Sequence, residues 1–258
     1  MQANLLRYFS YTDSPPPPLL SPGNGIVLAL YDSTLTALEP WARAGFQCES
    51  LAPSHRSKSL ANVRKRKVDL TRAGVLDQVV RKYSGRVALA LAFPPSTDLS
   101  IAGARWFAAK RRADPDFQTR AVAHLKAIEK LFQNLGCPWA IEGPGAGLLR
   151  KLWRNPDYVY NPCEFGAYLR PDEGHPLYPD IIPAQDAYTR STGLWTAPRF
   201  RMPARRPVPP VWRYFTSKSG RTRRMSPVSF KRKAGAARAS CPRGWARALC
   251  QRMASAVT

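Results

Sequence analysis

The sequence predicts an α/β fold built on a doubly wound, mostly parallel sheet, and three observations support this prediction. Residues 87–93 are apolar without interruption and stop at Pro94 and Pro95, which is typical of a strand buried on both faces of a sheet. Two further apolar runs, 26–30 and 137–141, are separated from it by segments with helical spacing, and such alternation indicates a parallel sheet. With 258 residues, 44% of them apolar, the chain is long enough for one sizeable domain.

The first half of the chain predicts strand, helix, loop and helix in that order. The strand at 26–30 is expected to be followed by a helix over 35–44, which would end at Gly45 because glycine is a common helix stop. Residues 53–67 predict a loop rich in Ser, Lys and Arg. Charge runs of this kind usually form a solvated surface, and phosphate contact is the alternative. A helix over 75–83 then leads into the central strand.

Polar residues follow two of the predicted strands directly. Ser96 comes just after the Pro-Pro turn that ends the central strand. A long helix over 116–135 precedes the strand at 137–141, and Glu142 follows that strand beside two glycines. The apolar stripe of this helix consists of Val122, Leu125, Ile128, Leu131, Phe132 and Leu135. Ligand sites of open α/β sheets lie at the carboxyl ends of strands, so Ser96 and Glu142 are candidate site residues. An ordinary turn at Ser96 and a cap or turn role for Glu142 are the alternatives.

The pattern changes over residues 153–215, where aromatic side chains, prolines and arginines alternate without helical spacing. The aromatic residues are Trp153, Tyr158, Tyr160, Phe165, Tyr168, Tyr178, Tyr188, Trp195 and Phe200. Such rings stack on bases in a nucleic-acid groove while arginines hold phosphates. They equally form the packing of a loop-rich subdomain, and the sequence leaves both interpretations open.

Charge is the strongest global feature of the chain. There are 40 Lys and Arg against 17 Asp and Glu, a formal net charge of +23. This excess favours a polyanionic partner, and nucleic acid comes before a membrane surface because no basic amphipathic helix dominates the sequence. A charge excess that only keeps the protein in solution is the alternative.

The basic residues are concentrated at the C-terminal end. No acid follows Asp186, and residues 201–258 contain fifteen Lys or Arg. Such a segment predicts a salt-sensitive anchor for DNA or RNA. Its middle part, 216–240, is expected to be disordered when unbound. Residues 242–254 are expected to form a short amphipathic helix through Trp245, Leu249 and Met253.

Three regions follow from these patterns. Residues 1–24, with Pro15 to Pro18, predict an extended Pro-rich arm; residues 25–200 predict the α/β domain; residues 201–258 predict the basic tail. The five cysteines are scattered without metal-ligand spacing, so a zinc site and a disulfide framework are not expected. With no apolar run of transmembrane length and no signal-like start, we expect a soluble, cytoplasmic protein.

Short motifs in a fixed order also carry a resemblance to a known family. The most informative segment is Phe93-Pro94-Pro95-Ser96-Thr97-Asp98-Leu99, followed by Gly103-Ala104-Arg105-Trp106-Phe107. The other matching segments are Glu142-Gly143-Pro144, 153–158, 164–169, His175-Pro176, 186–195 and Cys241-Pro242-Arg243-Gly244-Trp245-Ala246-Arg247-Ala248. Over about 26–215 and the last twenty residues, the chain is similar to phage- and prophage-encoded proteins of the DNA cytosine-5 methyltransferase type.

The resemblance implies a fold, a chemistry and a partner, which is DNA. The sheet would be of the S-adenosylmethionine-dependent methyltransferase type, with the cofactor beyond the carboxyl ends of its strands. A thiolate would attack carbon 6 of a flipped-out cytosine so that carbon 5 takes the methyl group. By position, Ser96 stands where the thiol belongs, Glu142 where a glutamate binds the ring nitrogen, and Arg190 where an arginine braces the base. The implied cofactor-binding positions are Tyr31, Asp32, Ser33, Asp69, Leu70 and Pro94.

The sequence departs from the family pattern at the positions that carry the chemistry. Ser96 supplies a hydroxyl, which is a far weaker acid than a thiol and needs a base to activate it. Residues 31–40 contain no glycine, Gly143 replaces an asparagine, and Glu49 is the nearest candidate for the acid that would bind the ribose. The resemblance therefore implies a DNA cytosine-5 methyltransferase-like protein that transfers a methyl group from S-adenosylmethionine to cytosine in DNA, with impairment by Ser96 as an open question. The alternatives are a non-catalytic DNA-binding relative of that family and an unrelated basic nucleic-acid-binding protein.

Overall fold

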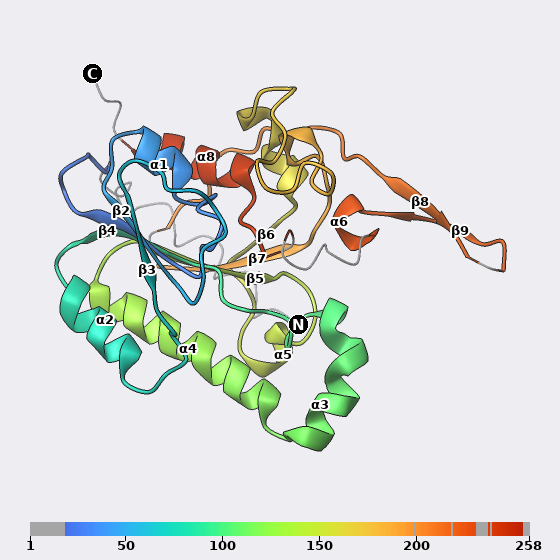
Figure 1. The fold of residues 1–258 in the computed structure, drawn as a ribbon, viewed down its shortest axis with the longest axis horizontal. Helices are drawn as coiled ribbons and strands as arrows, with labels where there is room; N and C mark the ends of the chain where they lie inside the picture. The colour runs from blue at the N-terminus through green and yellow to red at the C-terminus, as the bar shows by residue number, and fades with distance from the viewer. Residues whose placement is uncertain (1–18, 199, 218, 231–236, 238, 255–258) are drawn as a thin grey trace, which may run out of the picture.

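The computed structural model describes residues 19–198, 200–217, 219–230, 237 and 239–254. In this part of the chain, a seven-stranded sheet of order β3-β2-β1-β4-β5-β7-β6 forms the centre of the fold (Figure 1). The strands are β1 (Ile26–Leu30), β2 (Cys48–Ala52), β3 (Val63–Lys67), β4 (Val87–Ala92), β5 (Trp139–Pro144), β6 (Tyr158–Tyr160) and β7 (Thr192–Thr196). The first five run parallel to their neighbours, whereas β7 is antiparallel to both β5 and β6. The predicted α/β class with a mostly parallel sheet is confirmed.

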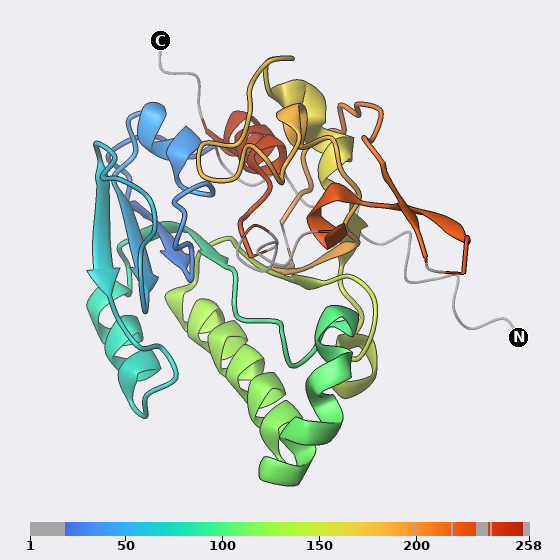
Figure 2. The same cartoon turned by 45° about the vertical axis from the view of Figure 1, so that its right-hand side comes forward.

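Helices cover both faces of this sheet (Figures 1 and 2). Helices α2 (Val75–Tyr83) and α4 (Phe117–Leu135) pack against one face, and α1 (Glu39–Arg43) and α8 (Arg243–Met253) pack against the other. Successive residues of β1 and β4 point alternately into the two apolar layers. This two-sided burial is why the sequence of the central strand is continuously apolar.

The remaining elements lie in the connections. They are η1 (Ile101–Trp106), α3 (Phe107–Ala113), α5 (Leu149–Leu152), η2 (Pro162–Tyr168), η3 (Ala184–Asp186), β8 (Arg213–Thr216), β9 (Thr222–Met225) and α6 (Pro227–Phe230). Strands β8 and β9 form a separate antiparallel hairpin. No helix in the described residues is both long and apolar enough to cross a membrane, and none of their His, Cys, Asp and Glu side chains gather into a group of three that could hold a metal ion.

The predicted helices are present, but the first is shorter than expected. Helix α2 has the predicted bounds, and the predicted apolar stripe of α4 is buried. Helix α1 begins only at Glu39, because the preceding backbone is held by the carboxylate of Asp32 and has a left-handed residue, Leu35, at φ 60°. It ends as expected at Gly45, whose φ is 85°.

The basic run at the end of the predicted loop 53–67 is a strand, and that part of the loop prediction is wrong. Strand β3 pairs with β2 at the edge of the sheet. Its Arg64 and Arg66 reach Glu49 of β2 at 3.4 and 2.7 Å, and Tyr83 donates to the same carboxylate at 2.6 Å. An edge strand tolerates charged residues because one of its sides faces solvent. Glu49 therefore holds the sheet edge together in the middle of β2, away from the strand's carboxyl end.

Most aromatic residues of 153–200 serve packing, whereas Tyr214 and Phe215 are exposed. Tyr160, Phe165, Tyr188, Trp195 and Phe200 are each at most 3% exposed. Their segment contains strands β6 and β7, which the sequence pattern did not predict, since both are short and the residues around them are rich in proline. Of the two interpretations left open, packing of a loop-rich region is the one that the structure favours.

The end of the chain belongs to the core. Helix α8 matches the expected amphipathic helix, and its Trp245, Leu249 and Met253 are buried in the layer that also contains Trp41 of α1. Leu20 packs against this layer and donates its N–H to the carbonyl of Met253 at 2.7 Å. The expected arm is thus attached to the domain from residue 19 on, and Pro15 to Pro18 lie outside the described residues.

The segment expected to be disordered contains regular structure. Part of the hairpin β8–β9 and all of α6 fall within 216–240. Cross-strand pairing of β-branched and aromatic residues with arginines explains the hairpin. Residues 231–236 and 238 of that segment lie outside the described residues.

Candidate active site at the carboxyl edge of the sheet

The candidate residues lie at or near the carboxyl ends of β1, β4 and β5. In the parallel register, Leu30 lies beside Ala92 and Ala92 beside Ile141. The N–H of Phe93 donates to the carbonyl of Leu30 at 2.9 Å, and then the Pro-Pro turn ends the pairing. Ser96 follows β4 as expected, but Glu142 lies inside β5, which runs on to Pro144 by pairing with β7, so the prediction that Glu142 comes after its strand is wrong. The parallel pairing of β5 with β4 ends at Ile141, so Glu142 still lies near the edge at which Ser96 leaves β4.

Glu142 and Arg190 form a nearly buried ion pair at this edge. Arg190 Nη2 lies 2.6 Å from Glu142 Oε1, and the two side chains are only 17% and 11% exposed. Arg190 precedes β7, and its Nε also donates to Thr192 Oγ1 at 3.2 Å. Because β7 pairs with β5, the antiparallel strand brings Arg190 back to Glu142. The structure thus brings together two of the three residues predicted to be catalytic.

The second oxygen of Glu142 is buried and has no hydrogen-bond partner within 3.5 Å among the described residues, and the same holds for the hydroxyl of Tyr160. Tyr160 is 1% exposed and lies near enough to Glu142 for a longer, weaker hydrogen-bond interaction that lowers the pKa of that carboxyl. Burial raises the pKa of Glu142 more than Arg190 and Tyr160 lower it. A buried polar atom without a partner costs about 1–3 kcal/mol, so the open oxygen marks a place that a ligand can complete.

Ser96 lies in the turn after β4, partly buried. Its carbonyl accepts the N–H of Leu99 at 3.1 Å, and the same loop is tied to α4 because Gln118 Nε2 donates to the carbonyl of Asp98 at 3.0 Å. None of the three histidines is placed to activate its hydroxyl. His55 contacts Ser50, His124 contacts Tyr31 and His175 contacts Ser240, each through Nε2.

Cys241 does not replace the missing nucleophile. Its thiol is 2% exposed, and it donates to the carbonyl of Pro242 at 3.5 Å. Burial, and then the charge of Glu142, raise its pKa well above the usual value, so the reactive thiolate form is disfavoured.

The loop after β1 contains three predicted cofactor positions, Tyr31, Asp32 and Ser33. Polar groups of these residues already form hydrogen bonds with other parts of the protein. Asp32 is 3% exposed, and its Oδ2 accepts the N–H groups of Ala37 and Leu38 at 3.0 and 3.3 Å. Burial raises the pKa of Asp32 to about 6, against the opposing effect of these hydrogen bonds. Tyr31, at φ 65°, contacts His124 Nε2 through its hydroxyl at 2.6 Å. The carbonyl of Ser33 accepts the N–H of Arg56 at 2.8 Å.

A buried polar network joins this loop to the C-terminal segment. Thr34 Oγ1 donates to Asp32 Oδ1 at 3.2 Å and lies 2.8 Å from Thr36 Oγ1. Ser240 Oγ lies 3.3 and 3.1 Å from these two hydroxyls and 3.1 Å from His175 Nε2. His175 Nδ1 accepts two backbone N–H groups, so the proton of the neutral ring is on Nε2 and points at Ser240. We call these five residues the Asp32–His175 network.

The other predicted cofactor positions have different environments. Asp69 is exposed and accepts the N–H and hydroxyl of Thr71 at 3.0 and 2.6 Å. Leu70 is 1% exposed and belongs to the apolar core beneath α2, and Pro94 is buried.

These residues do not fit S-adenosylmethionine. The carboxylate of Asp32 is already used by the backbone of its own loop, and Glu49 is committed to Arg66 and Tyr83. Leu35 occupies a left-handed position that glycine favours, and its side chain is 1% exposed. The loop therefore lacks a glycine at its left-handed position, and the Leu35 side chain there is packed into the interior.

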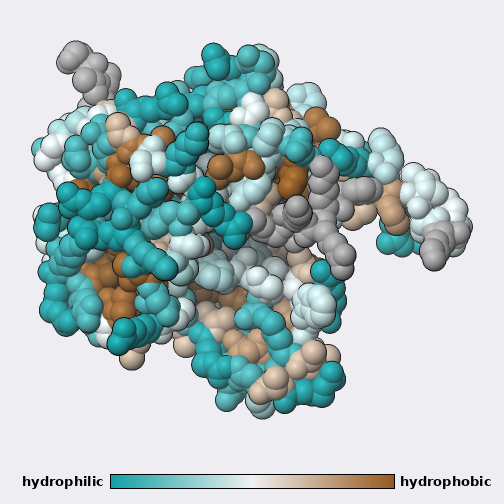
Figure 3. Space-filling model, viewed as in Figure 1, coloured by the Kyte–Doolittle hydropathy of each residue, from teal (hydrophilic) through white to brown (hydrophobic). Residues whose placement is uncertain are grey.

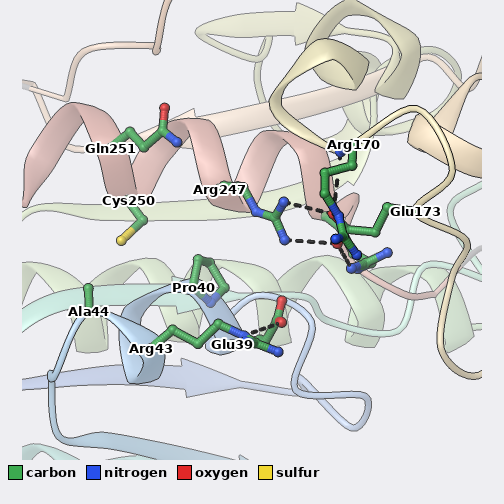
Figure 4. A pocket seen from close by; sticks show the side chains of 10 residues that line it. Glu39, Pro40, Arg43, Ala44, Arg170, Glu173, Arg247, Cys250 and Gln251 are labelled. Atoms are coloured by element: carbon green, nitrogen blue, oxygen red, sulfur yellow. Dashed lines mark hydrogen bonds and ion pairs between the residues drawn. The ribbon is translucent and has the colours of Figure 1, made fainter.

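A cavity of about 730 Å³ lies elsewhere, between α1 and α8, and Ser96, Glu142 and Arg190 are not part of its lining (Figure 4). Ion pairs surround it: Arg43 with Glu39 at 2.7 Å, and Arg247 with Glu173 at 2.9 Å. Burial alone would raise the pKa of Glu173, but Arg247 and Arg243 reverse this and lower it to about 2. The first pair lies within α1, and the pairs of Glu173 with Arg247 and Arg243 tie α8 to the loop before η3, so we assign both a structural role.

Comparison with known proteins adds no assignment: no protein-family model matches the chain, and no curated protein matches it.

Sequence reasoning missed Tyr160, Ser240 and His175. Tyr160 had a signal, since it lies in a Tyr-Val-Tyr alternation of aromatic and β-branched residues that is typical of a strand. No sequence pattern indicated Ser240 or His175, because their hydrogen bonds with each other and with Thr34 join residues that are distant in the sequence.

Proposed function

We propose that the protein binds DNA and holds a single cytosine against Glu142 and Arg190, as a non-catalytic relative of the DNA cytosine-5 methyltransferases. The observation that carries this proposal is the open Oε2 of Glu142, buried at the carboxyl edge of the sheet while its other oxygen is held by Arg190. The net charge of +23 supports a polyanionic partner.

The pair is suited to the hydrogen-bonding edge of cytosine. That edge offers an amine donor beside acceptor atoms, and a glutamate oxygen accepts from the amine. When protonated, the same carboxyl group can donate to the ring nitrogen, and burial favours that form by raising the pKa of Glu142. Arg190 fixes the orientation of the carboxyl group and adds donors for the base oxygen.

The base must leave the stack to reach this site, because a carboxylate only 11% exposed is out of reach of a paired base. Taking a base out of the duplex costs a few kcal/mol, and least where the base is unpaired. A duplex with one bulged cytosine is therefore the probe of choice.

The experiment is a fluorescence-anisotropy titration with three labelled duplexes: fully paired, with a bulged cytosine, and with a bulged thymine. We expect the bulged cytosine to bind at least fivefold tighter than the bulged thymine, since a good base contact contributes about 1–3 kcal/mol. Glu142→Gln should remove this preference. Glu129→Gln, which alters a glutamate paired with Arg154 at 2.8 Å on α4, is the matched control. Equal affinity of the wild type for the two bulges contradicts the proposal.

Methyl transfer from S-adenosylmethionine to cytosine in DNA is the second candidate. One observation favours it: Ser96 follows β4, the strand next to the one that contains Glu142. The second candidate needs a cofactor that the loop after β1 does not fit.

Calorimetry with S-adenosylmethionine and a tritiated-methyl assay test this candidate. We expect no binding and no transfer by the wild type. If the lineage is right, Leu35→Gly combined with Ser96→Cys should bring back cofactor binding and trap a duplex containing fluorocytosine covalently. Methyl transfer by the unaltered protein would make it an enzyme and overturn the non-catalytic assignment.

A further inference from the structure

Two projections of the molecule bury almost none of their side chains. One is the hairpin, Arg213–Met225, in which the residues of β8 and β9 are exposed except for a half-buried Met225. The other, which we call the arm, is residues 101–113, comprising η1 and α3, where only Gly103 is buried. A two-stranded hairpin with no core beneath it is marginal by itself, so its exposed rings indicate a partner.

Each face of the hairpin carries an aromatic ring opposite an arginine. Tyr214 pairs across the strands with Arg224, and Phe215 pairs with Arg223. Tyr214 and Phe215 are 69% and 46% exposed. The guanidinium of Arg224 also lies 4.2 Å from the ring centre of Trp212, which fixes it at the base of the hairpin. The hairpin thus presents rings and cations together on both faces.

The arm repeats this composition on a helix. Ile101 and Trp106 are 72% and 54% exposed, and Arg105 lies 5.1 Å over the ring of Trp106. Arg111 and Arg112 follow on α3, both exposed, and there is no acid within 101–113. Lys110 forms an ion pair with Asp98, which anchors the arm to the turn that contains Ser96.

The two projections lie toward the end of the molecule away from α2, on opposite sides of the sheet. In Figure 1 the hairpin extends to the right in the upper half, near α6, whereas α3 lies below the sheet on the side of α4. In space-filling view both stand out from the body (Figure 3). The arm follows β4 directly, so the edge with Glu142 and Ser96 is the part of the sheet next to it.

We propose that the hairpin and the arm form a clamp for duplex DNA, with the two-stranded ribbon in the major groove and the arm on the phosphate backbone. The major groove of B-DNA admits a two-stranded ribbon, whereas the deep, narrow major groove of duplex RNA does not. A membrane surface is less suited, because cations and rings lie on both faces of the ribbon. The inference rests on the proposed function in taking DNA as the partner, and it adds the surface and the groove.

The test is anisotropy with a labelled, fully paired DNA duplex over a salt series, using the full chain. We expect Arg221→Ala/Arg223→Ala in the hairpin, and Arg111→Ala/Arg112→Ala in the arm, each to weaken binding on the order of tenfold. Each double variant should lower the slope of log affinity against log salt by about 2, since one phosphate contact contributes roughly 0.9. Arg81→Ala/Arg86→Ala, two exposed arginines of α2 and the turn after it, is the matched control and should change neither value.

Tyr214→Ala/Phe215→Ala separates groove contacts from phosphate contacts. It should weaken binding about fivefold without changing the salt slope, because it removes no charge. All these positions are exposed, so thermal unfolding should match the wild type and confirm folding.

The outcomes separate the two proposals. Wild-type affinity and slope in both arginine variants overturn the clamp, while a bulged-cytosine preference would still support the base site. Weakening in the variants without any cytosine preference supports the clamp and removes the base site. Equal binding of duplex RNA, or no binding of duplex DNA, overturns the clamp.

Discussion

Two buried polar clusters at the same edge of the sheet differ in the hydrogen bonding of their atoms. The Asp32–His175 network connects a carboxylate, three hydroxyls and an imidazole through hydrogen bonds within the protein. The Glu142–Arg190 pair is somewhat more exposed, and it leaves one carboxylate oxygen, and the nearby hydroxyl of Tyr160, without a hydrogen-bond partner among the described residues.

This difference separates structure from function at that edge. A network with its atoms paired stabilises the native state and leaves nothing for a ligand to bind. An unpaired buried oxygen costs stability that only a ligand returns. The loop after β1 therefore has a structural role, whereas the unpaired oxygen on β5 is the basis of the proposed base-binding site.

The largest expected effect comes from breaking the open pair. Arg190→Met leaves the carboxylate of Glu142 buried without its cation and should lower the free energy of unfolding by about 3–5 kcal/mol. Urea denaturation measures it. Adding Glu142→Leu to Arg190→Met should recover much of the lost stability, because no buried charge then remains. If the double variant is no more stable than Arg190→Met alone, this reasoning is wrong.

The pH dependence of stability comes next. Burial raises the pKa of Asp32 to about 6, so between about pH 4 and 6 the native state holds more protons than the unfolded chain, and stability falls as pH rises. Burial, with Arg243, lowers the pKa of His175 to about 4, so its contribution to stability rises with pH over about pH 4 to 6.5. The two opposing slopes should largely cancel in the wild type.

Asp32→Asn removes the decrease in stability with pH that Asp32 causes and leaves the increase with pH that His175 causes. Its stability should rise between about pH 4 and 6.5 by on the order of 2 kcal/mol more than that of the wild type. Urea midpoints at several pH values measure this difference. Parallel profiles for the two proteins are the outcome that excludes Asp32 as a titrating group.

A smaller effect is expected within the closed network. Ser240→Ala removes the acceptor of the His175 Nε2–H and should cost about 1–2 kcal/mol. The exposed Ser84→Ala is the control. Affinity for DNA should not change, and a loss of bulged-cytosine preference in Ser240→Ala would show that the two clusters are coupled.

The sequence carries much of the fold, because its strongest patterns are local. The run at 87–93, the stripe of α4 and the amphipathic spacing of α8 each report the burial of their own residues. Strand β3 was not predicted, because four of its five residues are basic and their stabilising partner, Glu49, lies on another strand. Strands β6 and β7 were not predicted, because they are short and each pairs with a strand that is distant in the sequence.

The site divides in the same way. The position of Ser96 follows from the end of β4, which the sequence marks, whereas Glu142 was expected after a strand that in the structure runs on to Pro144 by pairing with β7. The pairing of Glu142 with Arg190 was expected only through a resemblance, and their separation by 48 positions shows why local patterns could not reveal it. The hydrogen bonds that hold the loop after β1 include one between Thr34 and Ser240, which are 206 positions apart, so a local pattern could not reveal it.

The contact between Leu20 and Met253, with Trp245 fully buried behind it, has a consequence for synthesis on the ribosome. One wall of the interior is missing until α8 has emerged, so the nascent chain cannot complete this hydrophobic layer before residue 253 has left the ribosome. A stop codon between the hairpin and the end of α8 would yield an incomplete domain subject to proteolysis.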